Sequence, residues 1–351
     1  MAWLLPPLPP TFEAALRDVR AHKPEARVAA AERLADPETS REHEAVQGLL
    51  ALADDLDPRV RATAMRALHE LGDERALPCL VRKVDDADPL VRELAVVALG
   101  DLPSPEASRS LRLALRSRYP EVRFQAALSY VQVCEQPELP ALAPLLRDAD
   151  AKVRANTARA LANVGAAAAP ELRRAQGDAD GAVRAEAALA LLRLGETPDP
   201  DALRGAFDDP ELLSEAIDAV AALQLRPLRD EVARVAQSVL KPLPLKAAAA
   251  RALLRLGDTR GIPALRSVLR AFRNDGRSHA VEVVGELGVR ELTPELVRLS
   301  RWLRGTDPEA LVAALAALLP LAARAREGLD RLARRDDAAG AQARAALVRA
   351  R

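Results

Sequence analysis

Apolar residues recur at helical spacing along almost the whole chain, in short stretches that end at a glycine or another turn residue. One stretch begins at Pro58, where a proline costs no helical hydrogen bond, and ends at Gly72. A second stretch follows at once, and its leucines and valines again recur three or four residues apart as far as Val84. The pattern predicts two antiparallel helices joined by a tight turn, and it contains no convincing strand.

A short phrase at the start of the first helix of each pair repeats along the sequence. It consists of an aspartate, commonly a proline, and then a valine and an arginine, as in Asp57-Pro58-Arg59-Val60-Arg61. The arginines of successive copies are Arg61, Arg92, Arg123, Arg154 and Arg184, at spacings of 31, 31, 31 and 30 residues. A fixed period of this size indicates a stacked array, in which each unit buries its apolar face on its neighbours.

The regularity of the phrase divides the chain into four parts. We expect a proline-rich lead with a capping helix at 1–23, regular repeats at 24–207, divergent repeats at 208–334 and a last capping helix at 335–351. In the divergent part, the positions that correspond to the repeat arginine hold Ser214, Lys246, Ser278 and Val312. The whole pattern predicts an all-α fold of about ten antiparallel helix pairs.

The composition agrees with such an array and excludes some other classes of protein. Aromatic residues make up only 2%, and 51 basic residues balance 51 acidic ones, so net charge gives no support for nucleic-acid or membrane binding. Cys79 and Cys134 fall in apolar stretches about two repeats apart, which indicates reduced core residues in a cytoplasmic protein. No apolar run is long enough to span a membrane, and prolines among the first ten residues argue against a signal peptide.

The repeated pattern resembles the HEAT repeat. The motifs that carry the resemblance are Asp-Pro-x-Val-Arg-x-x-Ala, then Ala-Leu-x-x-Leu-Gly-Asp, then x-Ala-Leu-x-x-Leu, and they match best over 55–207. The short bacterial variety seen in the phycobilin-lyase HEAT-like group is the most similar. The resemblance implies a right-handed α-α superhelix, but HEAT arrays serve as scaffolds, adaptors, lyases, hydroxylases and DNA-repair proteins, so it does not specify a function.

In HEAT proteins the aspartate and arginine of the phrase typically form a ladder that links neighbouring repeats. The resemblance implies this structural role for Asp57, Asp88, Asp150 and Asp180, together with Arg61, Arg92, Arg123, Arg154 and Arg184. Each aspartate can also cap the helix that it precedes. Tyr119 replaces the aspartate in the third copy.

The second helices of the pairs carry many arginines. Because HEAT arrays usually line their concave surface with the second helix, the resemblance predicts a basic, partner-binding groove there. Its predicted residues are Arg82, Arg109, Arg112, Arg116, Arg173, Arg174, Arg204, Arg266, Arg270, Arg273, Arg298, Arg301, Trp302 and Arg304, with Trp302 as the anchor. Alternatively, these cations only complement the dipoles at helix C-termini.

The function predicted from these features is a non-enzymatic scaffold or adaptor that binds a protein partner. An acidic segment is favoured, since arginine pairs with carboxylates in a bidentate way. The resemblance alone suggests a lyase-like, chromophore-handling enzyme as the alternative, and nucleic-acid binding is less favoured because aromatic platforms for bases are scarce. His43-Glu44 and His69-Glu70 resemble the pairs of di-iron HEAT hydroxylases but do not follow the repeat arginine directly. We therefore expect no catalytic residue, metal or cofactor.

Overall fold

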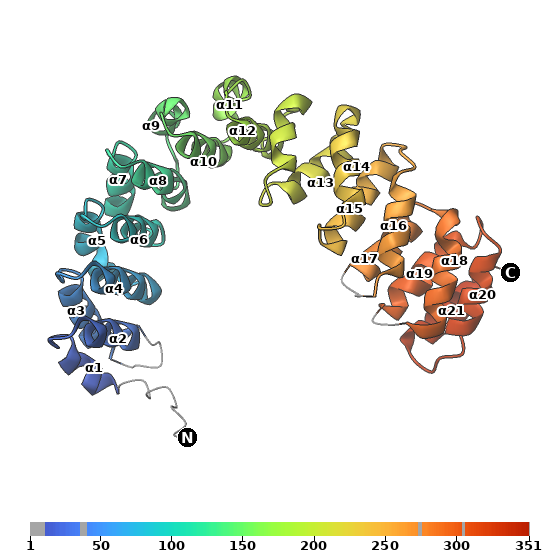
Figure 1. Cartoon of the computed structure of the whole chain (residues 1–351), viewed down its shortest axis with the longest axis horizontal. Helices are drawn as coiled ribbons and strands as arrows, with labels where there is room; N and C mark the ends of the chain where they lie inside the picture. The colour runs from blue at the N-terminus through green and yellow to red at the C-terminus, as the bar shows by residue number, and fades with distance from the viewer. Residues whose placement is uncertain (1–10, 36–40, 273–275, 304–305, 351) are drawn as a thin grey trace. The chain divides into compact units, whose positions relative to one another are not determined.

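A computed structural model describes residues 11–35, 41–272, 276–303 and 306–350, apart from the side chain of Trp302. Within these ranges every regular element is a helix (Figure 1), so the prediction of an all-α repeat fold is confirmed. The chain forms two compact units, residues 1–196 and residues 197–351. The proline-rich lead at 1–10 lies outside the described residues.

The first unit consists of two layers of short helices. Its helices are α1 (Phe12–Asp18), α2 (Pro24–Leu34), α3 (Glu42–Leu52), α4 (Pro58–Leu71), α5 (Leu77–Lys83), α6 (Pro89–Gly100), α7 (Pro105–Ala114), α8 (Pro120–Val133), α9 (Leu139–Leu142), α10 (Ala151–Leu161), α11 (Ala169–Ala175) and α12 (Gly181–Arg193). The helices that begin with the repeated phrase (α2, α4, α6, α8, α10 and α12, here called phrase helices) stack on one another in one layer. The helices between them form the other layer.

The aspartates of the phrase cap their own helices. Asp57 accepts a hydrogen bond from the backbone N–H of Arg59 at 2.9 Å, and Asp150 does so from Lys152 at 2.8 Å. Hydrogen bonds from the side chain and the backbone of Arg59 lower the pKa of Asp57 to about 2. Asp88 and Asp180 cap α6 and α12 in the same way. The prediction that these four aspartates link neighbouring repeats is therefore wrong, because their carboxylates face the first turn of their own helix.

The link between repeats uses a different acid, which generally stands two residues before the cap. Arg61 reaches Asp86 of the next repeat at 2.7 Å, and Asp86 also accepts the backbone N–H of the capping Asp88 at 3.0 Å. The same ladder comprises Arg27–Asp55 at 2.6 Å, Arg123–Asp148 at 2.6 Å and Arg154–Asp178 at 2.8 Å. An Asp-x-Asp before α4, α6, α10 and α12 is the sequence signal for this arrangement.

The ladder arginines also fasten the loop in front of their own helix. Arg123 donates to the carbonyl oxygen of Ser117 at 2.8 Å, and Arg184 donates to that of Asp178 at 2.8 Å, in each case six residues back. Since the guanidinium of Arg123 bonds both to the loop and to Asp148 of the next repeat, it fixes the spacing between α8 and α10.

The copy with Tyr119 keeps the ladder by another route. Arg92, which is only 6% exposed, pairs with Glu121, and its guanidinium carbon lies 3.7 Å from the centre of the Tyr119 ring. The tyrosine thus supplies a cation–π contact where the other copies have a capping aspartate.

Small residues let the phrase helices approach one another closely. At Gly100 a Cβ atom would lie 2.6 Å from the Oγ of Ser129 on α8, so α6 and α8 meet with almost no side chain between them. Leu99, Leu111 and Leu161, on α6, α7 and α10, are fully buried and belong to one core cluster. The core is therefore continuous along the first unit.

The second unit has the same two layers but not the same ladder. Its helices are α13 (Leu213–Leu223), α14 (Arg229–Gln237), α15 (Leu243–Arg255), α16 (Gly261–Arg270), α17 (Arg277–Glu286), α18 (Thr293–Trp302), α19 (Pro308–Leu318), α20 (Arg324–Leu332) and α21 (Ala338–Arg349). Before them, the segment Pro200–Phe207 forms a 3₁₀ helix where an α-helix was expected. Ser278, at a ladder position, accepts a hydrogen bond from the backbone N–H of Asp307 at 3.1 Å, a weaker link than an ion pair.

Candidate functional site

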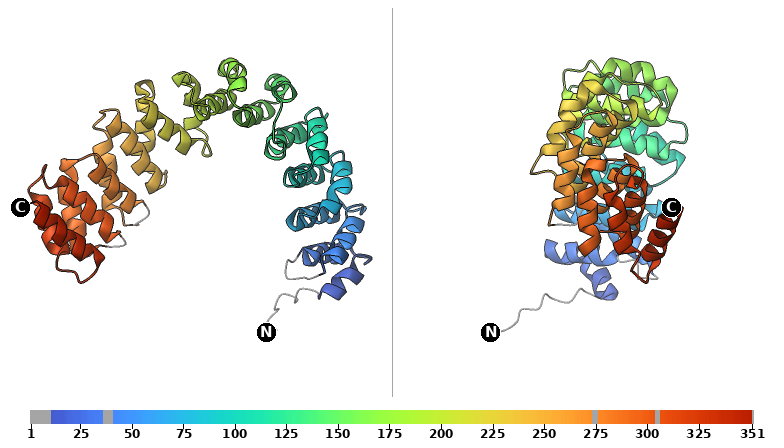
Figure 2. Two further views of the ribbon diagram at one scale, coloured as in Figure 1. Left: turned by 180° about the vertical axis from the view of Figure 1, so that it is seen from behind. Right: turned by 90° about the vertical axis from the view of Figure 1, so that its right-hand side faces the viewer.

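The second helices of the first unit do not lie where the sequence interpretation placed them. Both the front and the back view show α4, α6, α8 and α10 on the inner side of this unit's curve, with α5, α7, α9 and α11 outside (Figures 1 and 2). The phrase helices pack directly on one another, whereas the outer helices touch each other only weakly, as expected for the splayed side of a bend. The predicted concave position is therefore wrong for Arg82, Arg109, Arg112, Arg116, Arg173 and Arg174.

Most of the predicted arginines pair with a carboxylate of the neighbouring repeat. Arg112 lies 2.9 Å from Glu138, and Arg173 lies 2.8 Å from Glu196. In the second unit, Arg266 and Arg270 lie 3.1 and 2.7 Å from Glu295, whose carboxylate is nearly buried. The remaining contacts are Arg82–Asp54, Arg204–Glu231, Arg301–Glu327, Arg174–Glu171 within one helix, and Arg298 with the carbonyl oxygen of Leu269. Arg273, Arg304 and the Trp302 side chain lie outside the described residues.

The arginines predicted to line a basic groove therefore form a second set of contacts between repeats. The acid generally stands near the start of the following second helix, as Glu138 and Glu295 do. The sequence shows such acids, but it does not show that they come within reach of arginines one repeat earlier. A surface of neutralised pairs attracts an acidic partner much less than a row of free guanidinium groups would.

We expect the exposed pairs to contribute little to stability. Arg112→Ala should lower the melting temperature by less than about 3 °C, because both partners are half exposed and such pairs are typically worth less than about 1 kcal/mol. Thermal unfolding followed by circular dichroism measures this change. A decrease above 5 °C, on the order of 1–2 kcal/mol, would contradict this assignment.

One part of the predicted surface keeps free cations. Arg109, Arg112 and Leu113 follow one another at i, i+3 and i+4 on one face of α7, and Arg116, at i+7, lies in the turn directly after the helix; we call these four residues the α7 stripe. Leu113 is 68% exposed, and the arginines are exposed as well. Within the described residues, Arg109 and Arg116 have no carboxylate partner.

The local fold holds the α7 stripe in place from behind. Ser104 caps α7 by accepting the backbone N–H of Ala107 at 3.0 Å, and Ala107, Leu111 and Ala114 bury the opposite face of the helix. The stripe therefore combines two available guanidinium groups with an exposed aliphatic side chain on a fixed helix. Such a surface can pair with carboxylates and cover an apolar side chain at the same time.

Comparison with known families agrees with this architecture. The family described as HEAT repeats matches residues 9–87, 46–131, 82–152 and 139–224, which together span more than half of the chain. The chain belongs to the HEAT-repeat family. A further match, to the PBS lyase HEAT-like repeat, covers residues 245–271, the region of α15 and α16 in this HEAT protein.

Solved structures similar to this HEAT protein include importin beta, at 15% identity over 92% of this chain and 57% of that chain, with a TM-score of 0.54. An engineered protein is 20% identical over 97% of this chain and 98% of its own, with a TM-score of 0.44. The complex of CpcE and CpcF of phycocyanin lyase from Nostoc is 22% identical over 76% of this chain and 97% of that chain, with a TM-score of 0.36. Of these three, the likeness to importin beta supports the fold alone, and the other two, with TM-scores below 0.5, carry no argument. No curated protein matches the sequence.

Three of the four histidines of this HEAT protein, His43, His69 and His279, contact a charged side chain in the described structure. His69 lies 3.2 Å from Asp101, and His43 contacts Arg75. Nowhere in the described ranges do three His, Cys, Asp or Glu side chains group in a way that could hold a metal ion. The described helices also include none with the length and apolar character that crossing a membrane requires.

Proposed function

We propose that this HEAT-repeat protein is a non-enzymatic scaffold that binds an acidic, amphipathic segment of a protein partner at the α7 stripe. The observation that carries the proposal is the pair of uncompensated arginines, Arg109 and Arg116, on either side of the exposed Leu113. Carboxylates of the partner pair with the two guanidinium groups, and an apolar side chain of the partner covers the leucine.

The site is smaller than the one predicted from the sequence, and it lies on the outer side of the first unit. Arginines already paired with a neighbouring repeat, such as Arg173 and Arg270, do not contribute free charge to it. The lyase-like alternative rests on a repeat type at 245–271 that describes the array and not a chromophore site. A scaffold therefore accounts for more of the observed surface.

Reversing the two free charges tests the proposal. We expect the double variant Arg109→Glu/Arg116→Glu to bind a fluorescein-labelled peptide rich in glutamate and leucine at least about tenfold more weakly than the unmodified protein. Leu113→Ser should weaken the same complex without changing its dependence on salt, because it removes only apolar contact. Fluorescence anisotropy at low and high salt measures both effects.

The matched control carries the same change of charge elsewhere. Arg234 and Arg326 are exposed on α14 and α20 and have no carboxylate partner within the described residues. The variant Arg234→Glu/Arg326→Glu should bind the acidic peptide as the unmodified protein does. Equal weakening in both double variants would show that only net charge matters, and it would refute a site at α7.

A further inference from the structure

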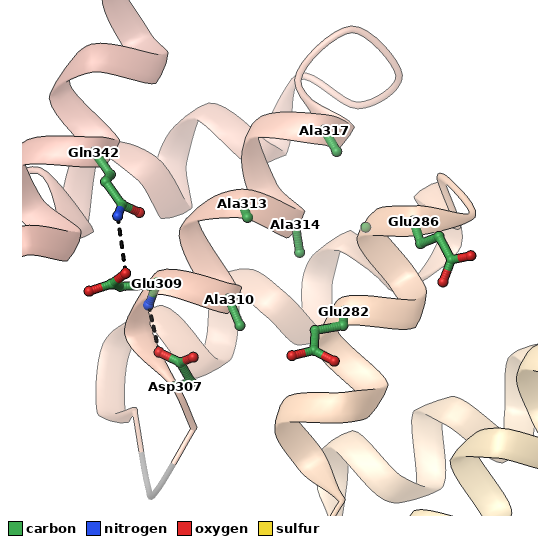
Figure 3. A pocket seen from close by; sticks show the side chains of 10 residues that line it. Glu282, Glu286, Asp307, Glu309, Ala310, Ala313, Ala314, Ala317 and Gln342 are labelled. Atoms are coloured by element: carbon green, nitrogen blue, oxygen red, sulfur yellow. Dashed lines mark hydrogen bonds between the residues drawn. The ribbon is translucent and has the colours of Figure 1, made fainter.

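A groove on the second unit lies between α17, α19 and α21 (Figure 3). It has a volume of about 590 Å³ and is open to solvent. Its floor is a row of alanines on α19, namely Ala310, Ala313, Ala314 and Ala317, and we call it the alanine groove. These residues follow one another at i, i+3, i+4 and i+7, so they share one face of the helix.

The hollow exists because the side chains that line it are small. A Cβ atom added to Gly285 of α17 would lie 2.7 Å from the Cα of Ala314, so the two helices touch backbone to backbone at that point. On the side of α19 that faces solvent, Ala313 and Ala317 are exposed and cover little of the helix. Another helix could approach α19 there as closely as α17 does at Gly285.

Carboxylates stand around the alanine floor. Glu286 is compensated by Arg251, at 3.1 Å, and by Arg255. The other three acids of the rim are Glu282, Asp307 and Glu309. Among the described residues, none of these three has a lysine or arginine partner.

The contacts of these three acids leave their negative charges in place. Glu309 accepts a hydrogen bond from the side chain of Gln342 at 3.1 Å, and Asp307 caps α19 by accepting the backbone N–H of Glu309 at 2.9 Å. Glu282 lies 3.6 Å from His279, one turn away on the same helix. The groove therefore combines an apolar floor with an acidic rim.

We infer that the alanine groove docks an amphipathic α-helix of a protein partner, with small residues against the alanines and lysine or arginine against the rim. The flat alanine floor matches the face of a helix, whereas small-molecule sites are more enclosed and are lined by large apolar and aromatic side chains. The carboxylates do not form a metal site, since no such group of ligands occurs in the described part of the chain. The uncompensated charge of the rim selects a basic helix over an acidic one.

This inference is independent of the α7 stripe. The two surfaces lie in different units and have opposite charge, so each can be removed without altering the other. A chain with both could hold one acidic and one basic partner segment at the same time.

Peptide binding tests the inference directly. The probe is a labelled, alanine-rich helical peptide with lysines along both edges of an uninterrupted alanine face, and its counterpart carries glutamates in place of the lysines. We expect the full-length protein to bind the lysine peptide, and the variant Glu282→Lys/Glu309→Lys to bind it about tenfold more weakly. Ala313→Phe, which fills the groove from an exposed position, should also abolish binding, but without changing the charge.

Matched controls separate the groove from net charge and from misfolding. Asp218→Lys/Asp330→Lys makes the same change of charge at exposed acids outside the groove, and Ala341→Phe adds the same bulk at an exposed position on α21. Both controls should bind the lysine peptide normally, and circular dichroism should show all variants folded. If Ala313→Phe does not fold, the test rests on the comparison of Glu282→Lys/Glu309→Lys with Asp218→Lys/Asp330→Lys. The inference is overturned if the unmodified protein does not bind the lysine peptide, if it binds the glutamate peptide equally well, or if the groove and control variants weaken binding alike.

Discussion

Replacing Arg123 with alanine will lower the free energy of unfolding of the first unit by about 3 kcal/mol. Arg123 pairs with Asp148 at 2.6 Å, and the side chains of the two residues are only 17% and 8% exposed. The substitution removes the cation and leaves a nearly buried carboxylate without compensation, which costs more than the pair itself contributes. It also frees the carbonyl oxygen of Ser117, so the loop before α8 loses a bond as well.

Urea unfolding followed by circular dichroism, combined with hydrogen exchange to locate the change, measures this effect. The protection of backbone amides against exchange should decrease in α8 and α10, the two helices whose spacing the ladder contact fixes. Arg82→Ala provides the control, since Arg82 is exposed and lies 3.8 Å from Asp54; its effect should stay below about 1 kcal/mol. The double variant Arg123→Ala/Asp148→Ala should recover part of the loss, because no buried charge then remains unpaired. Equal effects of Arg123→Ala and Arg82→Ala would show that the ladder contributes no more than a surface pair.

Acidification below the ordinary pKa of aspartate will destabilise the first unit. Hydrogen bonds from Arg27, Arg123 and Arg154 hold the pKa values of Asp55, Asp148 and Asp178 below 3.8, the ordinary value for aspartate. A carboxyl whose pKa is lower in the folded protein contributes its stabilisation above the ordinary pKa. That contribution is lost as the pH falls through the folded value. The pKa values of several ladder carboxylates are lowered in this way, so their losses add within one unit.

A pH series of thermal unfolding measures this loss. The variant Asp148→Asn/Asp178→Asn should be less stable than the unmodified protein at pH 7 and should lose less stability on going to pH 2, because two of the titrating groups are gone. A matched variant at exposed acids outside the ladder, Asp218→Asn/Asp330→Asn, should follow the unmodified protein. Identical pH profiles for the two double variants would contradict a role of the ladder in acid unfolding.

The fold could be predicted because helical periodicity and a repeat period are properties of the sequence itself. The arginine of each ladder contact was evident for the same reason. Its acid was not, since aspartates equivalent to both Asp55 and Asp57 occur in four of the repeats, and only the conformation of the loop decides which one faces Arg27. Both aspartates accept a backbone N–H, but Asp57 accepts that of Arg59 in its own helix, whereas Asp55 accepts that of Asp57 and also pairs with Arg27.

The candidate sites were harder to predict than the ladder, because they depend on distances between side chains that a sequence does not contain. Arg109, Arg112 and Arg116 could be recognised as a basic set, but Leu113 between them was not expected to be exposed. The side of the bend on which α7 lies depends on how closely each layer packs, and small residues such as Gly100 allow the phrase helices the closer approach. The alanine groove went unrecognised because alanines at helical spacing also fit an ordinary buried face.

The ladder has a consequence for how such a chain can change length in evolution. Most joints use the same parts, an arginine such as Arg123 on one side and an acid in the next loop, such as Asp148, on the other, whereas Arg92 pairs with Glu121 in the first turn of α8. If a segment of one period, 31 residues, were duplicated or deleted within the first unit, the arginine before the junction would still meet an equivalent acid after it. Gene duplication can therefore lengthen or shorten this part of the protein by whole repeats, without new compensating substitutions at the junction.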